Sequence, residues 1–176
     1  MATLWDETAV DVLRTGNASE PVQARNLFDM SAAMSDAYTA THSPDAISYA
    51  AYRLLLWRAS FDANLGRTFG LLTARMRSLC LSPDYTTTTD ATPAAAGNRI
   101  GAAAIAAGRH DGSHEALHYA DPSYVPTNQP LIVAVPGSTV EDATFWQPLA
   151  LGEIAPQGVA AVPAKVQSFV GAEWGN

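Results

Sequence analysis

Apolar residues recur at spacings of three and four over much of the chain before residue 110, which is the period of an α-helix with one buried face. The longest such stretch is residues 19–42, where Ser19 is the expected N-cap and Pro21 fits the first turn. Its predicted apolar face consists of Leu27, Phe28, Met30, Met34, Ala37 and Tyr38. A helix with such a face must pack against neighbours, so the rest of the chain is expected to supply them.

Four further helices are predicted, over residues 3–15, 44–64, 67–81 and 93–109. In the first, Asp6 and Glu7 lie in the opening turn, where carboxylates interact favourably with the helix dipole. Its expected face consists of Leu4, Val10, Val12 and Leu13. The helix over 44–64 is apolar around much of its circumference, which is typical of a central helix.

The helix over 67–81 is expected to bury Phe69, Leu72, Met76, Leu79 and Cys80 and to expose Arg67, Arg75 and Arg77. A polar, threonine-rich linker follows at 82–92. Thr92 then caps the next helix and Pro93 occupies its first position. Small residues, Gly97, Gly101, Ala104 and Gly108, recur every three or four positions, and because each glycine reduces helix propensity they predict close packing against another helix.

Helix periodicity disappears after residue 120, and seven of the eleven prolines lie in this part of the chain. Residues 131–135 are the one short extended run, with Pro136-Gly137 as its turn. The predicted fold class is therefore all-α: a bundle of five or six helices over 1–119, followed by an irregular proline-rich segment over 120–176 that packs on it. We interpret this as a single domain, the N-terminal half of a longer protein.

The chain has 176 residues, a formal net charge of −7, a pI near 4.8 and a single lysine, Lys165. Without a basic cluster, nucleic acid and anionic membranes are not expected partners. No basic region followed by an apolar run opens the sequence, and no apolar stretch is long enough to span a bilayer, so the expected location is cytoplasmic. The lone Cys80 excludes an intrachain disulfide and is interpreted as a small core residue.

The sharpest chemical motif is His114-Glu115-Ala116-Leu117-His118, with His110 four residues earlier. On a helix, histidines at i and i+4 face the same way and can bind zinc, with the glutamate as general base. Asp111-Gly112 and Pro122 bound the motif too closely for the long helix that such enzymes use, and only Glu141 or Asp142 offers a third ligand. We therefore interpret it as a short polar helix capped by Ser113, and keep a zinc hydrolase as an alternative.

Arg25 and Asp36 lie eleven residues apart, or three turns, and so share a face of the longest helix. The favoured interpretation is a pair of buried polar groups that holds helices in register. The sequence contains neither a Gly-x-Ser-x-Gly nucleophile turn nor a phosphate-binding loop with its lysine. No residue is assigned a catalytic, cofactor-binding or metal-binding role.

Several segments, in order, resemble the N-terminal part of vanadium-dependent haloperoxidase-like proteins, a helical superfamily shared with acid phosphatases. The segment 33–38 is similar to that family's Ala-Met-Tyr-Asp-Ala, with Ser35 in place of tyrosine. The other matching pieces are Trp5, residues 24–28, residues 97–115 with Asp111-Gly112-Ser113-x-Glu115, residues 124–130, Pro136-Gly137, residues 146–149 and Trp174-Gly175. The resemblance covers nearly the whole chain.

The resemblance implies a complete protein that binds vanadate and oxidises halide with hydrogen peroxide. In that family a lysine, two arginines, a Pro-Ser-Gly-His segment and a vanadium-bound histidine form the vanadate pocket. None of these is matched here: Lys165 does not fit the pattern, and Gly112-Ser113-His114 has a different order. The chain is thus expected to be a catalytically silent scaffold without its own cofactor, whose partner is the missing C-terminal half or a second copy. A non-catalytic helical interaction module is the other alternative.

Overall fold

The computed structural model describes residues 1–15, 20–60, 64–117, 119, 123, 125–129, 131–132, 140–145, 147, 149–151 and 165–167. The chain divides into two compact units, Met1–Asp111 and Gly112–Asn176. Each unit is described by itself.

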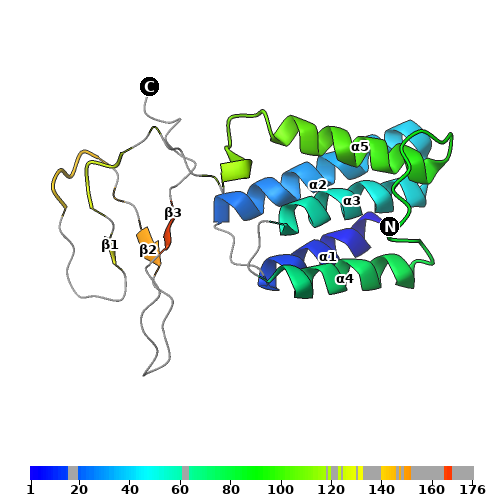
Figure 1. Cartoon of the computed structure of the whole chain (residues 1–176), viewed down its shortest axis with the longest axis horizontal. Helices are drawn as coiled ribbons and strands as arrows, with labels where there is room; N and C mark the ends of the chain where they lie inside the picture. Colours follow the sequence, from blue (N-terminus) through cyan, green and yellow to red (C-terminus); the bar gives the residue numbers. More distant parts are fainter. Residues whose placement is uncertain are drawn as a thin grey trace. The chain divides into compact units, whose positions relative to one another are not determined.

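The first unit is a bundle of α-helices (Figure 1). Their bounds are α1 (Ala2–Thr15), α2 (Glu20–Thr41), α3 (Pro44–Ala59), α4 (Leu65–Ser78) and α5 (Pro93–Gly108). The predicted helical bundle is confirmed for this unit, and α3 contacts each of the other four helices. Its central position agrees with its apolar circumference: of its sixteen residues, eleven are buried.

The core of this unit contains one or more large side chains from each of α1 to α4. The fully buried apolar ones are Trp5, Met30, Tyr52, Leu54, Leu72 and Met76. The rings of Trp5 and Tyr52 lie 6.5 Å apart between centroids, which joins α1 to α3. In helix α5 the buried positions other than Asn98 are alanine or glycine, including Ala95, Gly97 and Gly101, so the backbone of α5 lies close to the core.

Glycine sets the distance between α5 and α3. A methyl group placed on Gly97 would collide with the carbonyl oxygen and Cα of Ala46, and one on Gly101 would lie 2.9 Å from the Cβ of Arg53. Both backbones therefore approach more closely than any side chain larger than hydrogen permits. The close packing predicted from the glycine spacing is confirmed, as are the Thr92 cap and Pro93 at the first position of α5.

The buried faces of α1 and α2 differ in part from those predicted. In α1, Trp5, Ala9 and Val12 are buried, whereas Val10 is exposed. In α2 the face is centred on Met30, Ala33, Met34 and Ala37, all buried. Phe28 is 71% exposed and Tyr38 is 54% exposed, so both were assigned wrongly to the core. Helix α2 packs against α3 and α5, and the two alanines of its buried face let neighbouring backbones come close.

Helix α4 ends at Ser78, earlier than predicted, and Cys80 is exposed rather than buried. Cys80 has a positive φ of 58°, its N–H donates to the carbonyl of Arg77, and the N–H of Leu81 donates to the carbonyl of Met76. These bonds form the Schellman motif that ends many helices, with Cys80 at the position that favours glycine. The motif turns Leu81, not Cys80, back onto the core.

The predicted exposed arginine face of α4 is confirmed for Arg67 and Arg77, but Arg75 is half-buried. Its Nε donates to the Thr8 hydroxyl at 2.7 Å, which links α4 to α1.

Helix α3 ends at Ala59 rather than near residue 64. Ser19 and Phe61, expected to cap α2 and to extend the face of α3, lie outside the described residues.

The described residues of the second unit include a short 3-10 helix, η1 (Glu115–Leu117), and three strands, β1 (Leu131–Ile132), β2 (Leu149–Leu151) and β3 (Lys165–Gln167). Strand β2 pairs in parallel with β1 and in antiparallel fashion with β3. The predicted extended run begins in β1, and its remainder, 133–135, lies outside the described residues, as does much of the predicted irregular segment. Among the described helices, none has the length and apolar character needed to cross a membrane.

Candidate functional site

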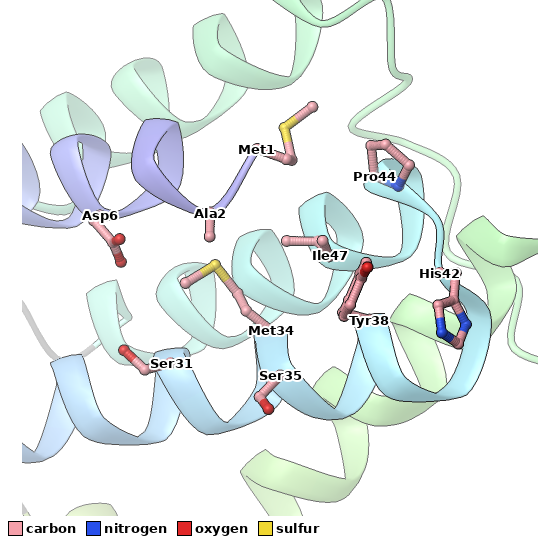
Figure 2. Close-up of a pocket in the computed structure, with 10 residues that line it drawn as sticks. All are labelled: Met1, Ala2, Asp6, Ser31, Met34, Ser35, Tyr38, His42, Pro44 and Ile47. Carbon is pink, nitrogen blue, oxygen red and sulfur yellow. The ribbon is translucent and has the colours of Figure 1, made fainter.

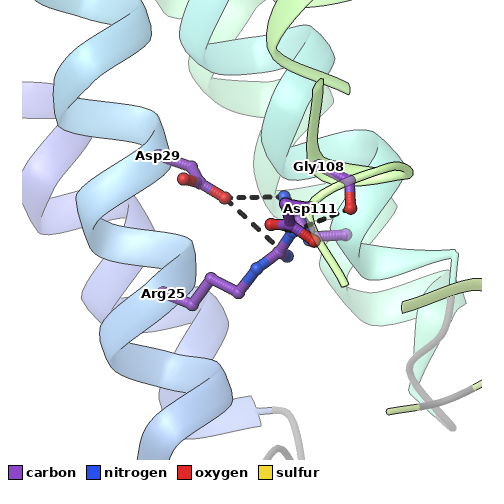
Figure 3. Close-up of polar contacts among 5 residues, drawn as sticks. Arg25, Asp29, Gly108 and Asp111 are labelled. Carbon is purple, nitrogen blue, oxygen red and sulfur yellow. Dashed lines mark hydrogen bonds and ion pairs between the residues drawn. The ribbon is translucent and has the colours of Figure 1, made fainter. Parts of the chain in front are cut away.

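Arg25, on α2, reaches the far end of α5. One of its terminal nitrogens lies 2.6 Å from a carboxylate oxygen of Asp111 and also donates to the carbonyl of Gly108 at 3.0 Å (Figure 3). Its other terminal nitrogen lies 3.7 Å from a carboxylate oxygen of Asp29, one turn further along α2. The carbonyl of Gly108 is one of the last in α5, where unpaired carbonyls carry partial negative charge. Arg25 thus places a positive charge at the C-terminal end of α5 and satisfies one of its last carbonyl groups.

Asp29 also accepts a bond from Arg58 of α3, at 2.7 Å. The side chain of Arg58 is only 3% exposed, so its charge needs a carboxylate partner. We call these four side chains, Arg25, Asp29, Arg58 and Asp111, the Arg25 cluster. Its two guanidinium groups and two carboxylates balance in formal charge. Chemically it is a junction that ties α2, α3 and the end of α5 together, and an incoming anion would meet two carboxylates.

Asp36 is exposed and takes no part in this cluster. The prediction that Arg25 and Asp36 form a buried polar pair is therefore wrong for Asp36, although Arg25 does hold helices together. The signal available in the sequence was Asp29, which lies one turn from Arg25 and is well placed for an ion pair on the helix surface.

The His-Glu-x-x-His motif does not lie on a long helix in the part of the chain that the structure describes. Glu115 begins η1, which is three residues long, and His114 precedes it with a positive φ of 54°. The residue directly before this helix is thus His114, one place after the predicted cap, Ser113. Glu115 is buried, whereas His114 is exposed, and His118 lies outside the described residues.

The proposed third ligands are also described. Glu141 is exposed. Asp142 accepts bonds from the hydroxyl and the backbone N–H of Thr144, and these bonds lower the pKa of its carboxyl group. Both backbone N–H groups, of Glu141 and Asp142, donate to the buried side chain of Asn128. The arrangement is typical of a loop held by local hydrogen bonds.

Within the described residues, no group of three or more His, Cys, Asp or Glu side chains is placed to hold a metal ion. Since His118 is outside that set, zinc binding stays a prediction. Elemental analysis of the purified chain tests it: stoichiometric zinc that is lost in a His114→Ala, His118→Ala variant would support a metal site.

One polar network was not foreseen from the sequence. The Nε of Arg53 donates to the side-chain oxygen of Asn98 at 2.8 Å, and a terminal nitrogen donates to the carbonyl of Tyr85 at 2.6 Å. The amide of Asn98 donates in turn to the carbonyls of Tyr85 and Thr87. Burial lowers the pKa of Arg53, which reflects how far this guanidinium is withdrawn from water. The signal was Asn98 itself, a polar residue in a helix of small apolar ones.

These bonds hold the threonine-rich loop 82–92 against α3 and α5. Arg99 adds bonds to the carbonyls of Thr88 and Asp90. The acceptors in the loop are backbone carbonyls, so the network satisfies main-chain groups of the loop. It is a structural clamp.

No protein family, no curated protein and no solved structure matches this chain. Arguments about function therefore depend on its own residues and on the resemblance of its motifs.

Proposed function

We propose that this chain is the helical scaffold portion of a vanadium-dependent haloperoxidase-like protein, whose complete form oxidises halide with hydrogen peroxide. The resemblance spans ordered segments from Trp5 to Trp174-Gly175. The observation that supports the proposal best is the ion pair of Arg25 with Asp111, because it joins two of those segments, residues 24–28 and Asp111-Gly112-Ser113-x-Glu115. Residues in the segments that resemble the family thus hold the helices of the first unit together.

Other residues of the resembling segments are also structural. Trp5, Ala33 and Ala37 are buried in the core of the bundle. A residue that is fully covered by apolar neighbours contributes packing and cannot contact a substrate without local opening. This distribution is what a scaffold requires.

The same cluster is unsuited to bind an oxyanion. Vanadate is an anion and requires convergent positive groups, whereas Arg25 and Arg58 already pair with Asp29 and Asp111. Placing an oxyanion there would set it against two carboxylates. The vanadate pocket of the complete form is accordingly assigned to residues other than these, and no residue of this chain is assigned to it.

The first experiment uses the purified chain. Vanadate binding followed by vanadium-51 NMR, and bromination of phenol red with peroxide and bromide, should both give the signal of the protein-free control. Tight vanadate binding together with vanadate-dependent bromination by this chain would contradict the scaffold assignment.

The second experiment tests the family assignment separately. We expect the coding DNA after the codon for Asn176 to continue in frame and to encode a lysine, two arginines and a Pro-Ser-Gly-His segment. An immediate stop codon, or a continuation without those residues, would refute the proposed complete form while leaving the description of the scaffold intact.

A further inference from the structure

An apolar groove lies between α2 and the starts of α1 and α3 (Figure 2). Its volume is about 570 Å³. It is lined by Met1, Ala2, Asp6, Ser31, Met34, Ser35, Tyr38, His42, Pro44 and Ile47. Met34 and Ile47 are buried and form its floor, whereas Tyr38 is more than half exposed and forms part of a wall. An exposed aromatic side chain beside an apolar floor is a feature of binding surfaces.

Among the described residues that line this groove, Asp6 is the one acidic side chain and no lysine or arginine is present. Asp6 is exposed, and no basic side chain of the described part of the chain forms an ion pair with it. It also borders a second depression that contains Arg14 and Arg75. Those arginines donate instead to Asp11 and to Thr8. The groove therefore has an apolar floor with the exposed carboxylate of Asp6 at one end, and Met1, which carries the terminal ammonium group, also lines it (Figure 2).

The backbone around the groove favours a helical partner. All three walls are helices, whose main-chain groups are already bonded within each helix, so the groove offers no strand edge to an extended peptide. A partner must then satisfy its own main-chain groups, as an α-helix does. The exposed hydroxyls of Ser31 and Ser35 add a polar rim on the α2 side.

We propose that this groove is a docking site for an amphipathic helix of another protein, whose apolar side chains cover Met34 and Ile47 and whose arginine or lysine pairs with Asp6. The inference is carried by the groove and its charge and does not depend on the haloperoxidase resemblance. A failure of this proposal would leave the scaffold assignment standing, and the reverse also holds.

The experiment uses the full chain with any affinity tag at the C-terminus, so that the start of α1 is unaltered. The probes are two synthetic helical peptides with the same leucine pattern, one with arginine at the polar positions and the other with glutamate. Affinity is measured by fluorescence anisotropy, and the site is mapped by amide chemical-shift changes in two-dimensional NMR. We expect the arginine peptide to bind more tightly and to shift amides of α2 and of the starts of α1 and α3.

Variants separate charge from apolar contact. Asp6→Asn should weaken binding of the arginine peptide by about two- to fivefold, the range of an exposed ion pair, and Asp6→Lys should reverse the preference between the peptides. Tyr38→Ser should weaken both peptides. The control is Asp36→Asn, since Asp36 is an exposed carboxylate of α2, the helix that carries Tyr38, and does not line the groove, and it should leave both affinities unchanged.

Three results would overturn the proposal. One is equal binding of the two peptides, or no binding of the arginine peptide. Another is a set of shift changes located away from the groove, for example on α4. The third is a concentration-dependent dimer in size-exclusion chromatography that Tyr38→Ser abolishes, because it would identify a second copy of the chain as the occupant.

Discussion

The hydroxyl of Tyr49, on α3, donates a hydrogen bond to the carbonyl oxygen of Ser82 at 2.9 Å and so fastens the start of the loop 82–92 to the central helix. Burial raises the pKa of this phenol, because the ionised form would lose its hydration. The folded protein therefore holds the phenolic proton more tightly than the unfolded chain does. The resulting stability is fully present below about pH 10, the ordinary value for tyrosine, and is lost as the pH rises towards the higher folded pKa.

We expect Tyr49→Phe to reduce the alkaline loss of stability. Urea unfolding measured at about pH 8 and about pH 11 should show a smaller decrease in the free energy of unfolding for the variant than for the wild type. At neutral pH the variant should be less stable by about 1 kcal/mol, because one hydrogen bond is missing. Tyr38→Phe is the control, since Tyr38 is exposed, and its free energy of unfolding should decrease between the two pH values as much as that of the wild type.

An equal decrease in the free energy of unfolding for Tyr49→Phe and the wild type would refute the claim that the Tyr49 phenol is buried and hydrogen-bonded.

A second prediction concerns the contact of α5 with α3. Gly97→Ala should lower the free energy of unfolding by about 1–3 kcal/mol, because the added methyl group meets the backbone of Ala46, which cannot rotate away. Gly70→Ala, in the interior of α4, has open space around the added atom and should instead raise it by about 0.5–1 kcal/mol through helix propensity. Urea unfolding measures both. The opposite signs are the test: a neutral or stabilising Gly97→Ala would mean that the helices are further apart.

A third prediction concerns the end of α4. Cys80→Gly should stabilise the protein by about 1 kcal/mol, because glycine adopts the positive φ of 58° without the steric cost that a side chain carries. Cys80→Ala removes the thiol but keeps the Cβ, so its melting temperature should stay close to that of the wild type. A stabilisation of equal size in both variants would locate the effect in the thiol and not in the backbone.

A fourth prediction concerns the Arg25 cluster. Arg25→Ala should lower the free energy of unfolding by about 1–3 kcal/mol, because the Gly108 carbonyl and two carboxylates lose a charged donor. Asp111→Asn should have a smaller effect, below about 1 kcal/mol, since the Asp111 side chain is 41% exposed and solvent screens its charge.

The double variant measures the coupling of the pair. The combined loss should be smaller than the sum of the single losses, because the two side chains share one contact. The control is the exposed pair Arg14 and Asp11, for which Arg14→Ala should change stability by less than about 0.5 kcal/mol. Additive losses for Arg25 and Asp111 would show that their ion pair does not form in solution.

The helices could be predicted from the sequence because their signals are local. Thr92 and Pro93 mark the start of α5, and the spacing of Gly97 and Gly101 predicts its close contact with a neighbour. The central position of α3 in the bundle could be predicted because this helix is apolar around most of its circumference. Each of these inferences uses residues within one element, where period and capping suffice.

What could not be predicted depends on contacts between elements. Phe28 and Tyr38 fit the apolar period of α2, but the buried face of the helix is centred on its two methionines and two alanines, and the two aromatic residues lie outside it. The partners of Arg25 include Gly108 and Asp111, which are more than eighty positions away. Spacing along one helix could suggest Asp36 or Asp29 for Arg25, but it could not reveal a residue at the end of another helix.

The clamp formed by Arg53, Asn98 and Arg99 has a consequence for attack by proteases. Threonine-rich loops with extended backbone are ordinarily easy to cleave, because a protease must draw several residues into its active site. Here the carbonyls of Tyr85, Thr87, Thr88 and Asp90 are bonded to α3 and α5, so the loop leaves the surface only when these bonds break. A cut in this loop would therefore report the breaking of these bonds, and its rate would follow the population of the opened loop.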